Sequence, residues 1–213
     1  MKLLIASRNR HKIEEIRAIL NLPAVDLVDI EAFSNLPEVV EDGQTFQANA
    51  VKKAVMLALS ARVWTLADDS GLEVDALGGD PGVYSARYAG ESVNYAANNA
   101  KLLQAMADQP VRTARFRCVI ALASADGRAQ IAEGVCEGQI IHAERGNQGF
   151  GYDPLFVPSG YDQTFAEMDA ALKNQLSHRA RALKQARERW GEILLQSVPS
   201  WPSRRKPRPP CAQ

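Results

Sequence analysis

The feature that most constrains this sequence is a pair of short apolar runs, each ending in a polar cluster. Residues 2–6 form an apolar run rich in strand formers, and residues 63–67 form a second run that opens onto the acidic cluster 68–71. Between them, 10–21 and 45–62 carry apolar residues at helical spacing, so strands and helices alternate. Alternation of this kind indicates a sheet whose ligands bind beyond the carboxyl ends of its strands. The sequence therefore predicts an α/β protein.

The second half of the chain is richer in strands than the first. Two strands are expected at about 114–124 and 129–137, joined by a turn at Asp126-Gly127. The other expected elements are a strand at about 25–30, a helix at about 92–107, a short strand at 140–143 and a final helix at about 177–196. This order predicts a mixed sheet with flanking helices and room for a second lobe.

Composition and charge exclude several classes of protein. The 213 residues suit one domain, and no apolar stretch approaches the roughly 20 residues that cross a bilayer. Residues 1–197, the expected domain, carry 21 basic and 25 acidic side chains, a balance that does not fit a general nucleic-acid binder. Residues 198–213 hold five of the eleven prolines and four basic residues, which is typical of a flexible tail.

The cysteines and the start of the chain bear on its location. Cys118, Cys136 and Cys211 are widely spaced and have no zinc-site spacing, so we expect two buried thiols and one thiol in the tail. The first apolar run meets charged residues too soon for a signal peptide. A reducing, cytoplasmic location is expected.

A first candidate site lies where residues 2–6 lead into the helix at 10–21. Asn9 stands at the expected N-cap, and the free N–H groups of a helix start suit phosphate oxygens. Lys12 adds a cation, and Ser7 adds a hydroxyl. Capping alone would explain Ser7 and Asn9 equally well, because many strand–helix junctions carry such residues.

A second candidate site holds the carboxylates Asp68 and Asp69, with Glu41 at the end of an earlier loop. Adjacent side chains on an extended chain point in different directions, so one acid can bind a metal while the other orients a ligand or water. Carboxylate oxygens are ligands that Mg²⁺ favours. A simple turn is the alternative, since Asp, Ser and Gly are turn residues. Repulsion between paired acids behind an apolar strand favours a metal site.

A third candidate site combines 149–154, Lys173 and 177–179. Glycines on both sides of Phe150 would let its ring lie flat against a base. Lys173 and Arg179 are cations that can reach a phosphate or a carbonyl group. His178 is either catalytic or, as is commoner at a helix start, a capping or packing residue.

Together these blocks resemble the inosine triphosphate pyrophosphatases, also called non-standard purine nucleoside triphosphate pyrophosphatases. The resemblance spans about residues 2–195. The matching blocks are Ser7-Arg-Asn-Arg-His-Lys12, Glu41-Asp-Gly-Gln-Thr-Phe46 with Asn49 and Lys53, Ala67 to Leu77, Pro81 to Tyr88, Gly149 to Pro154, and Lys173 with Ser177-His-Arg179. Ser7 stands where threonine is common, and the stretch between Cys136 and Gly149 is shorter than in some relatives.

The resemblance implies a long mixed sheet with flanking helices and two lobes around a central nucleotide cleft, in a homodimer. It implies Mg²⁺-dependent hydrolysis of ITP, dITP and XTP to the monophosphate and pyrophosphate, which would cleanse the nucleotide pool. Glu41 and Asp69 would bind Mg²⁺, and Asp69 would accept the proton, a role for which the residues alone leave Asp68 open. The implied substrate-binding residues are Ser7, Arg8, Asn9, Arg10, His11, Lys12, Lys53, Ser70, Phe150, Gly151, Tyr152, Asp153, Lys173, His178 and Arg179.

Two other functions fit the same residues. A regulatory module could bind a nucleotide without hydrolysing it, although a pure binder has little use for crowded carboxylates. A related pyrophosphatase could act on modified pyrimidine triphosphates. No stable nucleic-acid or membrane partner is expected.

Overall fold

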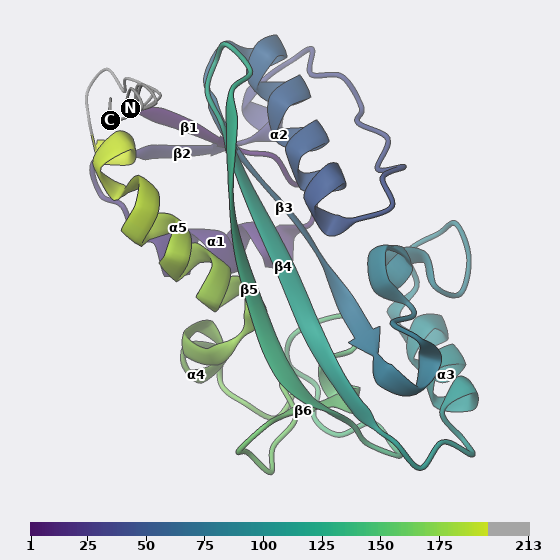
Figure 1. Ribbon diagram of the computed structural model, residues 1–213. Helices are drawn as coiled ribbons and strands as arrows, with labels where there is room; N and C mark the ends of the chain where they lie inside the picture. Colours follow the sequence, from purple (N-terminus) through teal and green to yellow (C-terminus); the bar gives the residue numbers. More distant parts are fainter. Residues whose placement is uncertain (196–213) are drawn as a thin grey trace, which may run out of the picture.

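The computed structural model describes residues 1–195, in which six strands form one mixed sheet in the order β2-β1-β3-β4-β5-β6 (Figure 1). The strands are β1 (Lys2–Ile5), β2 (Asp26–Asp29), β3 (Trp64–Val74), β4 (Thr113–Ala123), β5 (Ala129–Ile140) and β6 (Phe156–Pro158). The α-helices are α1 (Arg10–Leu20), α2 (Phe46–Ala61), α3 (Tyr95–Ala105), α4 (Ala170–Leu176) and α5 (His178–Leu195). Short 3₁₀ turns are η1 (Ile30–Ala32), η2 (Asp75–Leu77), η3 (Gly82–Arg87) and η4 (Asp153–Leu155).

The sheet is parallel at one side and antiparallel at the other. β1 pairs in parallel with β2 and β3, whereas β3, β4, β5 and β6 pair in sequence as antiparallel neighbours. This arrangement confirms the predicted mixed α/β sheet. The division into two lobes stays a prediction.

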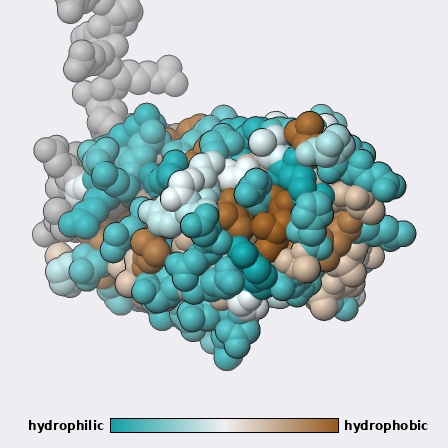
Figure 2. Space-filling view, turned by 90° about the horizontal axis from the view of Figure 1, so that it is seen from below, coloured by the Kyte–Doolittle hydropathy of each residue, from teal (hydrophilic) through white to brown (hydrophobic). Residues whose placement is uncertain are grey.

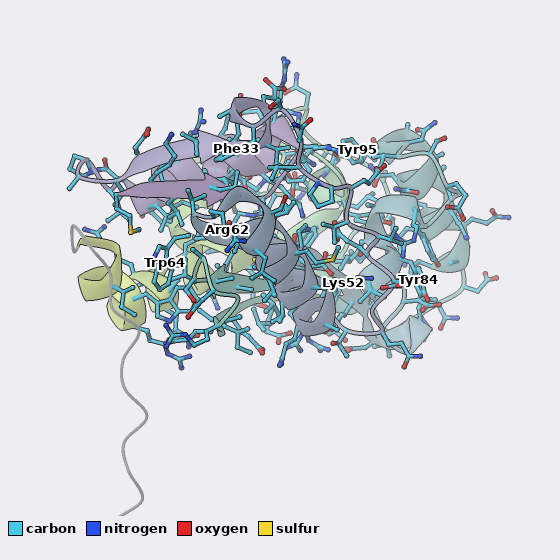
Figure 3. All side chains as sticks on the ribbon, turned by 90° about the horizontal axis from the view of Figure 1, so that it is seen from above. Phe33, Lys52, Arg62, Trp64, Tyr84 and Tyr95 are labelled. Atoms are coloured by element: carbon cyan, nitrogen blue, oxygen red, sulfur yellow. The ribbon has the colours of Figure 1, made fainter. Side chains whose placement is uncertain are left out.

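Helices cover both faces of the sheet, and the alternation of each strand divides the core between them. Leu3 and Ile5 belong to the cluster that packs on α1 and α5, while Leu4 and Ala6 belong to the cluster under α2. Figure 3 shows α2 lying across the molecule between the N-terminal strands and the part that carries η3 and α3. The predicted apolar face of α2 is confirmed, since Phe46, Ala50, Ala54, Leu57 and Ala58 are all buried.

A third apolar cluster fills the far ends of β3, β4 and β5 together with β6, where it includes Leu72, Phe116 and Phe156. Seen from this end, the surface is mainly hydrophilic, with a hydrophobic area in a hollow between hydrophilic rims (Figure 2). Cys118 and Cys136 are buried free thiols, as predicted, and burial raises the pKa of both.

One edge of β5 is paired with β6 only at its last residues, which leaves the rest of that edge without a partner strand. Side chains of α5 cover this part of the edge. Arg181 donates to Val135 O and Arg189 to Ile131 O, and Gln185 Oε1 accepts the N–H of Glu133. The helical spacing of four matches the strand spacing of two, since both advance about 6 Å. A row of helix side chains therefore satisfies an edge that would otherwise be free to pair with another chain.

Several expected elements differ in the structure. The strand expected at 140–143 is wrong: β5 continues to Ile140, and the N–H of Ile141 bonds instead to Leu155 O. Strand β6 and helix α4 were not predicted, because they span only three and seven residues. The tail at 198–213 lies outside the described residues. Within 1–195, no helix is both long and apolar enough to span a membrane.

Gly134 on β5 allows α5 to approach the sheet closely. A Cβ at this position would lie 2.2 Å from His178 O and 2.3 Å from Ala182 N. We expect Gly134→Ala to lower the free energy of unfolding by about 1–3 kcal/mol, because backbone must move to relieve the overlap. Urea denaturation measures this change.

Gly191→Ala on α5 is the matched control, since no described atom lies within 4 Å of a Cβ there. Alanine at a helical position should leave stability unchanged or raise it by up to about 1 kcal/mol. Equal stability of Gly134→Ala and the wild type would contradict the close packing of α5.

Candidate active site

The acidic cluster lies inside strand β3 and not in a turn beyond its end, which corrects the strand predicted at 63–67. Asp68 pairs with Ile120 of β4 and Asp69 with Val119, and the ladder continues to Val74. On its other side, β3 loses its partner earlier, because β1 ends where Ile5 pairs with Leu66. The two carboxylates therefore stand just past the carboxyl end of β1, as expected for a site in an α/β sheet.

Asp68 faces α1 and α5 and is held by their cations. Its Oδ2 lies 3.2 Å from Lys12 Nζ and 3.0 Å from Arg179 Nη2, and it accepts the hydroxyl of Ser70 at 3.2 Å. Burial works against the charge of this carboxyl, yet Lys12 and Arg179 hold the pKa of Asp68 well below its usual range. Asp68 is thus a permanently ionised group.

Asp69 faces α2 on the opposite side of the strand, which confirms that the adjacent acids point in different directions. Asn49 Nδ2 donates to its Oδ2 at 3.0 Å, and the Ser70 N–H donates to its Oδ1 at 3.0 Å. Burial raises the pKa of Asp69 to about 6; Lys12 and Lys53 oppose this shift, and the charge of Glu41 adds to it. Lys12 therefore acts on both aspartates from the edge of β3 that β1 leaves open.

Glu41 and Asp69 form a donor set that suits a hard divalent cation. Glu41 is close enough for its charge to raise the pKa of Asp69, and its Oε1 lies 2.8 Å from Lys53 Nζ. Among the described residues, no three His, Cys, Asp or Glu side chains gather into a complete metal cage. Two carboxylates match the way in which Mg²⁺ is bound in nucleotide sites, where phosphates and waters complete the shell.

The turn before α1 places polar groups around Lys12. Asn9 caps the helix by accepting the Lys12 N–H, and its Nδ2 donates to Tyr95 Oη at 3.2 Å. Ser7 Oγ accepts the Asn9 N–H at 3.1 Å. Arg8 forms an exposed ion pair with Glu38. Capping is therefore a role of Asn9, while Ser7 holds the turn that precedes the helix.

Phe150 lies in a cluster of cations and a second ring. Its ring stacks on His11 with centroids 5.2 Å apart and planes 11° apart, and Lys173 Nζ lies 5.0 Å from its centroid. Its backbone N–H donates to Asp153 Oδ2, which also accepts Lys173 Nζ at 2.6 Å. The segment after Gly149 is thus fixed to α4 through a buried acid.

His178 and Arg179 begin α5 and are buried. The His178 ring stacks on Phe116 at 4.7 Å, and burial with the charges of Arg179 and Lys173 lowers its pKa well below the usual value. The His178 ring is therefore packed on Phe116, and its Nδ1 has no hydrogen-bond partner among the described residues. Its predicted role in substrate binding stays a prediction. Arg179 binds Asp68, Ser70 and Glu15 at once.

Most of the predicted residues surround one cavity. It is lined by Asn9, Lys12, Ser70, Phe150, Gly151, Tyr152, Asp153, Lys173, His178 and Arg179, together with Gly71, Ser85, Ala86, Tyr95 and Phe116. Ser7, Arg8 and Arg10 line a separate groove between α1 and the end of β2, and His11 lines a hollow on the other side of Phe150. Lys53 belongs to α2, where it binds Glu41, and Asp69 binds Asn49 of the same helix. Lys12, which lines the cavity, is close enough for its charge to act on Asp69.

With this geometry established, comparison with known proteins identifies the family. The sequence matches the Ham1 family over residues 3–189. The chain belongs to the Ham1 family. It is 53% identical over 190 residues to the dITP/XTP pyrophosphatase of Desulforamulus reducens, a match that covers 88% of this chain and 94% of that protein.

Two solved structures have the same fold. A HAM1 protein from Coxiella burnetii aligns with a TM-score of 0.83 and 39% identity over 90% of this chain and 99% of that one. A nucleoside-triphosphatase / dITP/XTP pyrophosphatase from Mycobacterium abscessus aligns with a TM-score of 0.72 and 42% identity, over 86% of this chain and 97% of that one. The resemblance found in the sequence is thereby confirmed.

Besides the cavity residues added above, sequence reasoning missed side chains that bind the predicted ones. Glu15 binds both Lys173 and Arg179, Asn49 binds Asp69, and Tyr95 binds Asn9. Glu15 follows Lys12 by three residues, a spacing that places the two on one helix face. Asn49 is a polar residue inside the apolar stripe of α2, which was also a usable signal. Tyr95 gave none.

The raised pKa of Asp69 predicts a pH-dependent effect on stability. The carboxyl is easier to protonate in the folded than in the unfolded chain, so the free energy of unfolding falls as pH rises from about 4 to about 6. In EDTA, Asp69→Asn should therefore be more stable than the wild type above pH 6, by about 1–3 kcal/mol. The difference should shrink toward pH 4.

Urea melts of both proteins at pH 4.5 and pH 8 measure this effect. Using the difference between the two proteins removes contributions from other titrating groups. If the two melts differed equally at both pH values, Asp69 would not be the group with the raised pKa.

Proposed function

We propose that this chain hydrolyses non-standard purine nucleoside triphosphates (ITP, dITP and XTP) to the monophosphate and pyrophosphate. The observation that carries the proposal is the pair Asp68 and Asp69, whose environments push their pKa values apart beside Lys12 and the start of α1. Such a divergence is typical of acid–base sites. Relatives named dITP/XTP pyrophosphatase support the substrate class.

Glu41 and Asp69 would hold Mg²⁺ against the phosphates. When bound, the ion would neutralise part of the triphosphate charge and favour departure of pyrophosphate. Lys12 and Lys53 are the protein cations beside these acids, and both are partly buried. Their charges would act on the phosphates through a medium that contains little water, where they are worth more than at the surface.

Asp69 is the better general base of the two aspartates. Its hydrogen-bond partners are the Asn49 amide and the Ser70 N–H, so its oxygens are not committed to an ion pair and can take a proton from an attacking water. Asp68 is unsuited to this task, because two cations hold its pKa far below neutrality. We infer that Asp68 keeps Lys12 and Arg179 in place.

Arg179 would recognise a keto group at position 6 of the purine. Its guanidinium has five N–H groups, of which four have acceptors on Asp68, Ser70 and Glu15. The remaining Nη1–H can donate to a carbonyl oxygen. An adenine amino group would face this donor unpaired, at a cost of about 1–3 kcal/mol when buried.

Pyrophosphate release tests the proposal directly. We expect release from ITP, dITP and XTP with Mg²⁺ and none in EDTA, with ATP, dUTP and methylated pyrimidine triphosphates much slower. Asp69→Asn should lower kcat by at least about 100-fold, the contribution expected of a general base. Binding of ITP without release would favour the regulatory module, and preference for a pyrimidine would favour the other pyrophosphatase.

The expected homodimer stays a prediction that light scattering can check.

Phe150 is expected to stack on the purine. Phe150→Ala should raise KM for XTP by about 10-fold or more, because base stacking on an aromatic ring is worth about 1–3 kcal/mol. Its kcat should change less, since a ring stacked on the base would not touch the reacting phosphorus. A fall in kcat without a rise in KM would contradict stacking and indicate that Phe150 positions Lys173 or His11.

A further inference from the structure

Asn49 is a buried amide that the proposed mechanism has not used. It is 1% exposed and lies on the face of α2 that also buries Phe46 and Ala50. Its Oδ1 accepts the N–H of Gly43 at 2.7 Å, and its Nδ2 donates to Asp69 Oδ2 at 3.0 Å. Both ends of the amide are therefore engaged outside the helix.

These two contacts require an amide in particular. Gly43 N–H is a donor and needs an acceptor, whereas ionised Asp69 is an acceptor and needs a donor. The side chain of asparagine carries an acceptor and a donor on one planar amide, and its length suits both contacts. The fit is close, because a Cβ on Gly43 would lie 2.6 Å from Asn49 Oδ1. The Ser70 N–H holds the second oxygen of Asp69, so the plane of this carboxylate is fixed.

The same helix face also fixes the second acid. Lys53 follows Asn49 by one helical turn, and its Nζ lies 2.8 Å from Glu41 Oε1. Glu41 is two residues before Gly43, and its carbonyl oxygen accepts Arg87 Nη2 at 3.1 Å. Asn49 thus binds one acid directly and the loop of the other acid through Gly43.

We propose that Asn49 is a positioning residue that sets the distance between the carboxylates of Glu41 and Asp69 so that they bind one divalent cation together. This inference rests on the proposed function. Two carboxylates of like charge separate or turn away from one another when nothing holds them. Hydrogen bonds from neighbouring groups orient metal ligands, and loss of such a bond typically weakens metal binding about 10–100-fold.

The test compares Asn49→Leu with Asn98→Leu. Leucine has nearly the shape of asparagine but neither donor nor acceptor. Asn98 is an equally buried amide with bonds to Ala89 N–H and to the carbonyl groups of Ser85 and Ala86, none of which is a carboxylate. Both variants lose a buried hydrogen-bonded amide, so they share the general effect on stability.

Mn²⁺ binding to the nucleotide-free protein, followed by electron paramagnetic resonance, is the first measurement. Asn49→Leu should weaken it about 10–100-fold, and Asn98→Leu should leave it at the wild-type value. The second measurement is pyrophosphate release from XTP. Asn49→Leu should raise the half-saturating Mg²⁺ concentration, while KM for XTP at saturating Mg²⁺ changes little.

Wild-type Mn²⁺ affinity in a folded Asn49→Leu protein would overturn the proposal, and so would an equal loss in both variants. If Asn49→Leu does not fold, Asn49→Ser decides, because a hydroxyl cannot bridge both partners and should still weaken Mn²⁺ binding. A wild-type protein that binds Mn²⁺ but releases no pyrophosphate would contradict the proposed function alone. A wild-type protein that binds no Mn²⁺ would overturn the role of Asn49.

Discussion

The burial of Asp68 in the middle of a sheet is the constraint on which the rest of this structure depends. The side chain is 1% exposed, and an isolated carboxylate there would be strongly destabilising. Lys12 and Arg179 supply the compensating charge from α1 and α5, two helices that are far apart in the sequence and adjacent in the fold. The packing of α1 and α5 side by side on one face of the sheet therefore also assembles the candidate site. Removing either cation would leave a buried charge, so this part of the fold and the site depend on the same contacts.

The buried charges extend beyond Asp68 in an alternating series. Glu15 joins Arg179 to Lys173, and Lys173 in turn binds Asp153, whose other contact is the N–H of Phe150. Three acids thus balance three cations across α1, α4 and α5. A network of this kind contributes little net stability, since desolvation offsets most of the attraction. Its effect is on geometry, because each charged group is held by partners from other elements of the fold.

The sequence predicts those parts of the molecule whose signals are local. Periodicity located α1, α2 and the β4–β5 hairpin, and the turn at Asp126-Gly127 was correct. It failed at β3, where the turn formers after Ala67 remain in the ladder because β4, some fifty residues later, supplies hydrogen-bond partners as far as Val74. Pairing with a partner strand thus outweighs the local turn propensity of these residues. Most cavity residues were predicted from the family pattern, whereas the contact of Glu15 with Arg179 and that of Tyr95 with Asn9 join segments far apart in the sequence and become visible only in the fold.

The extension of β3 has a chemical consequence that a turn would not have. In a turn, the two acids would share one solvated environment and nearly one pKa. In a strand, successive side chains face opposite sides, so each acid meets a different set of partners. Asp68 meets two cations, which hold its pKa low, whereas burial, with the added repulsion of Glu41, raises the pKa of Asp69. The early end of β1 then lets Lys12 act on both acids. One dipeptide in a sheet can thus supply a fixed anion and a titratable base about one residue apart, without any loop to order.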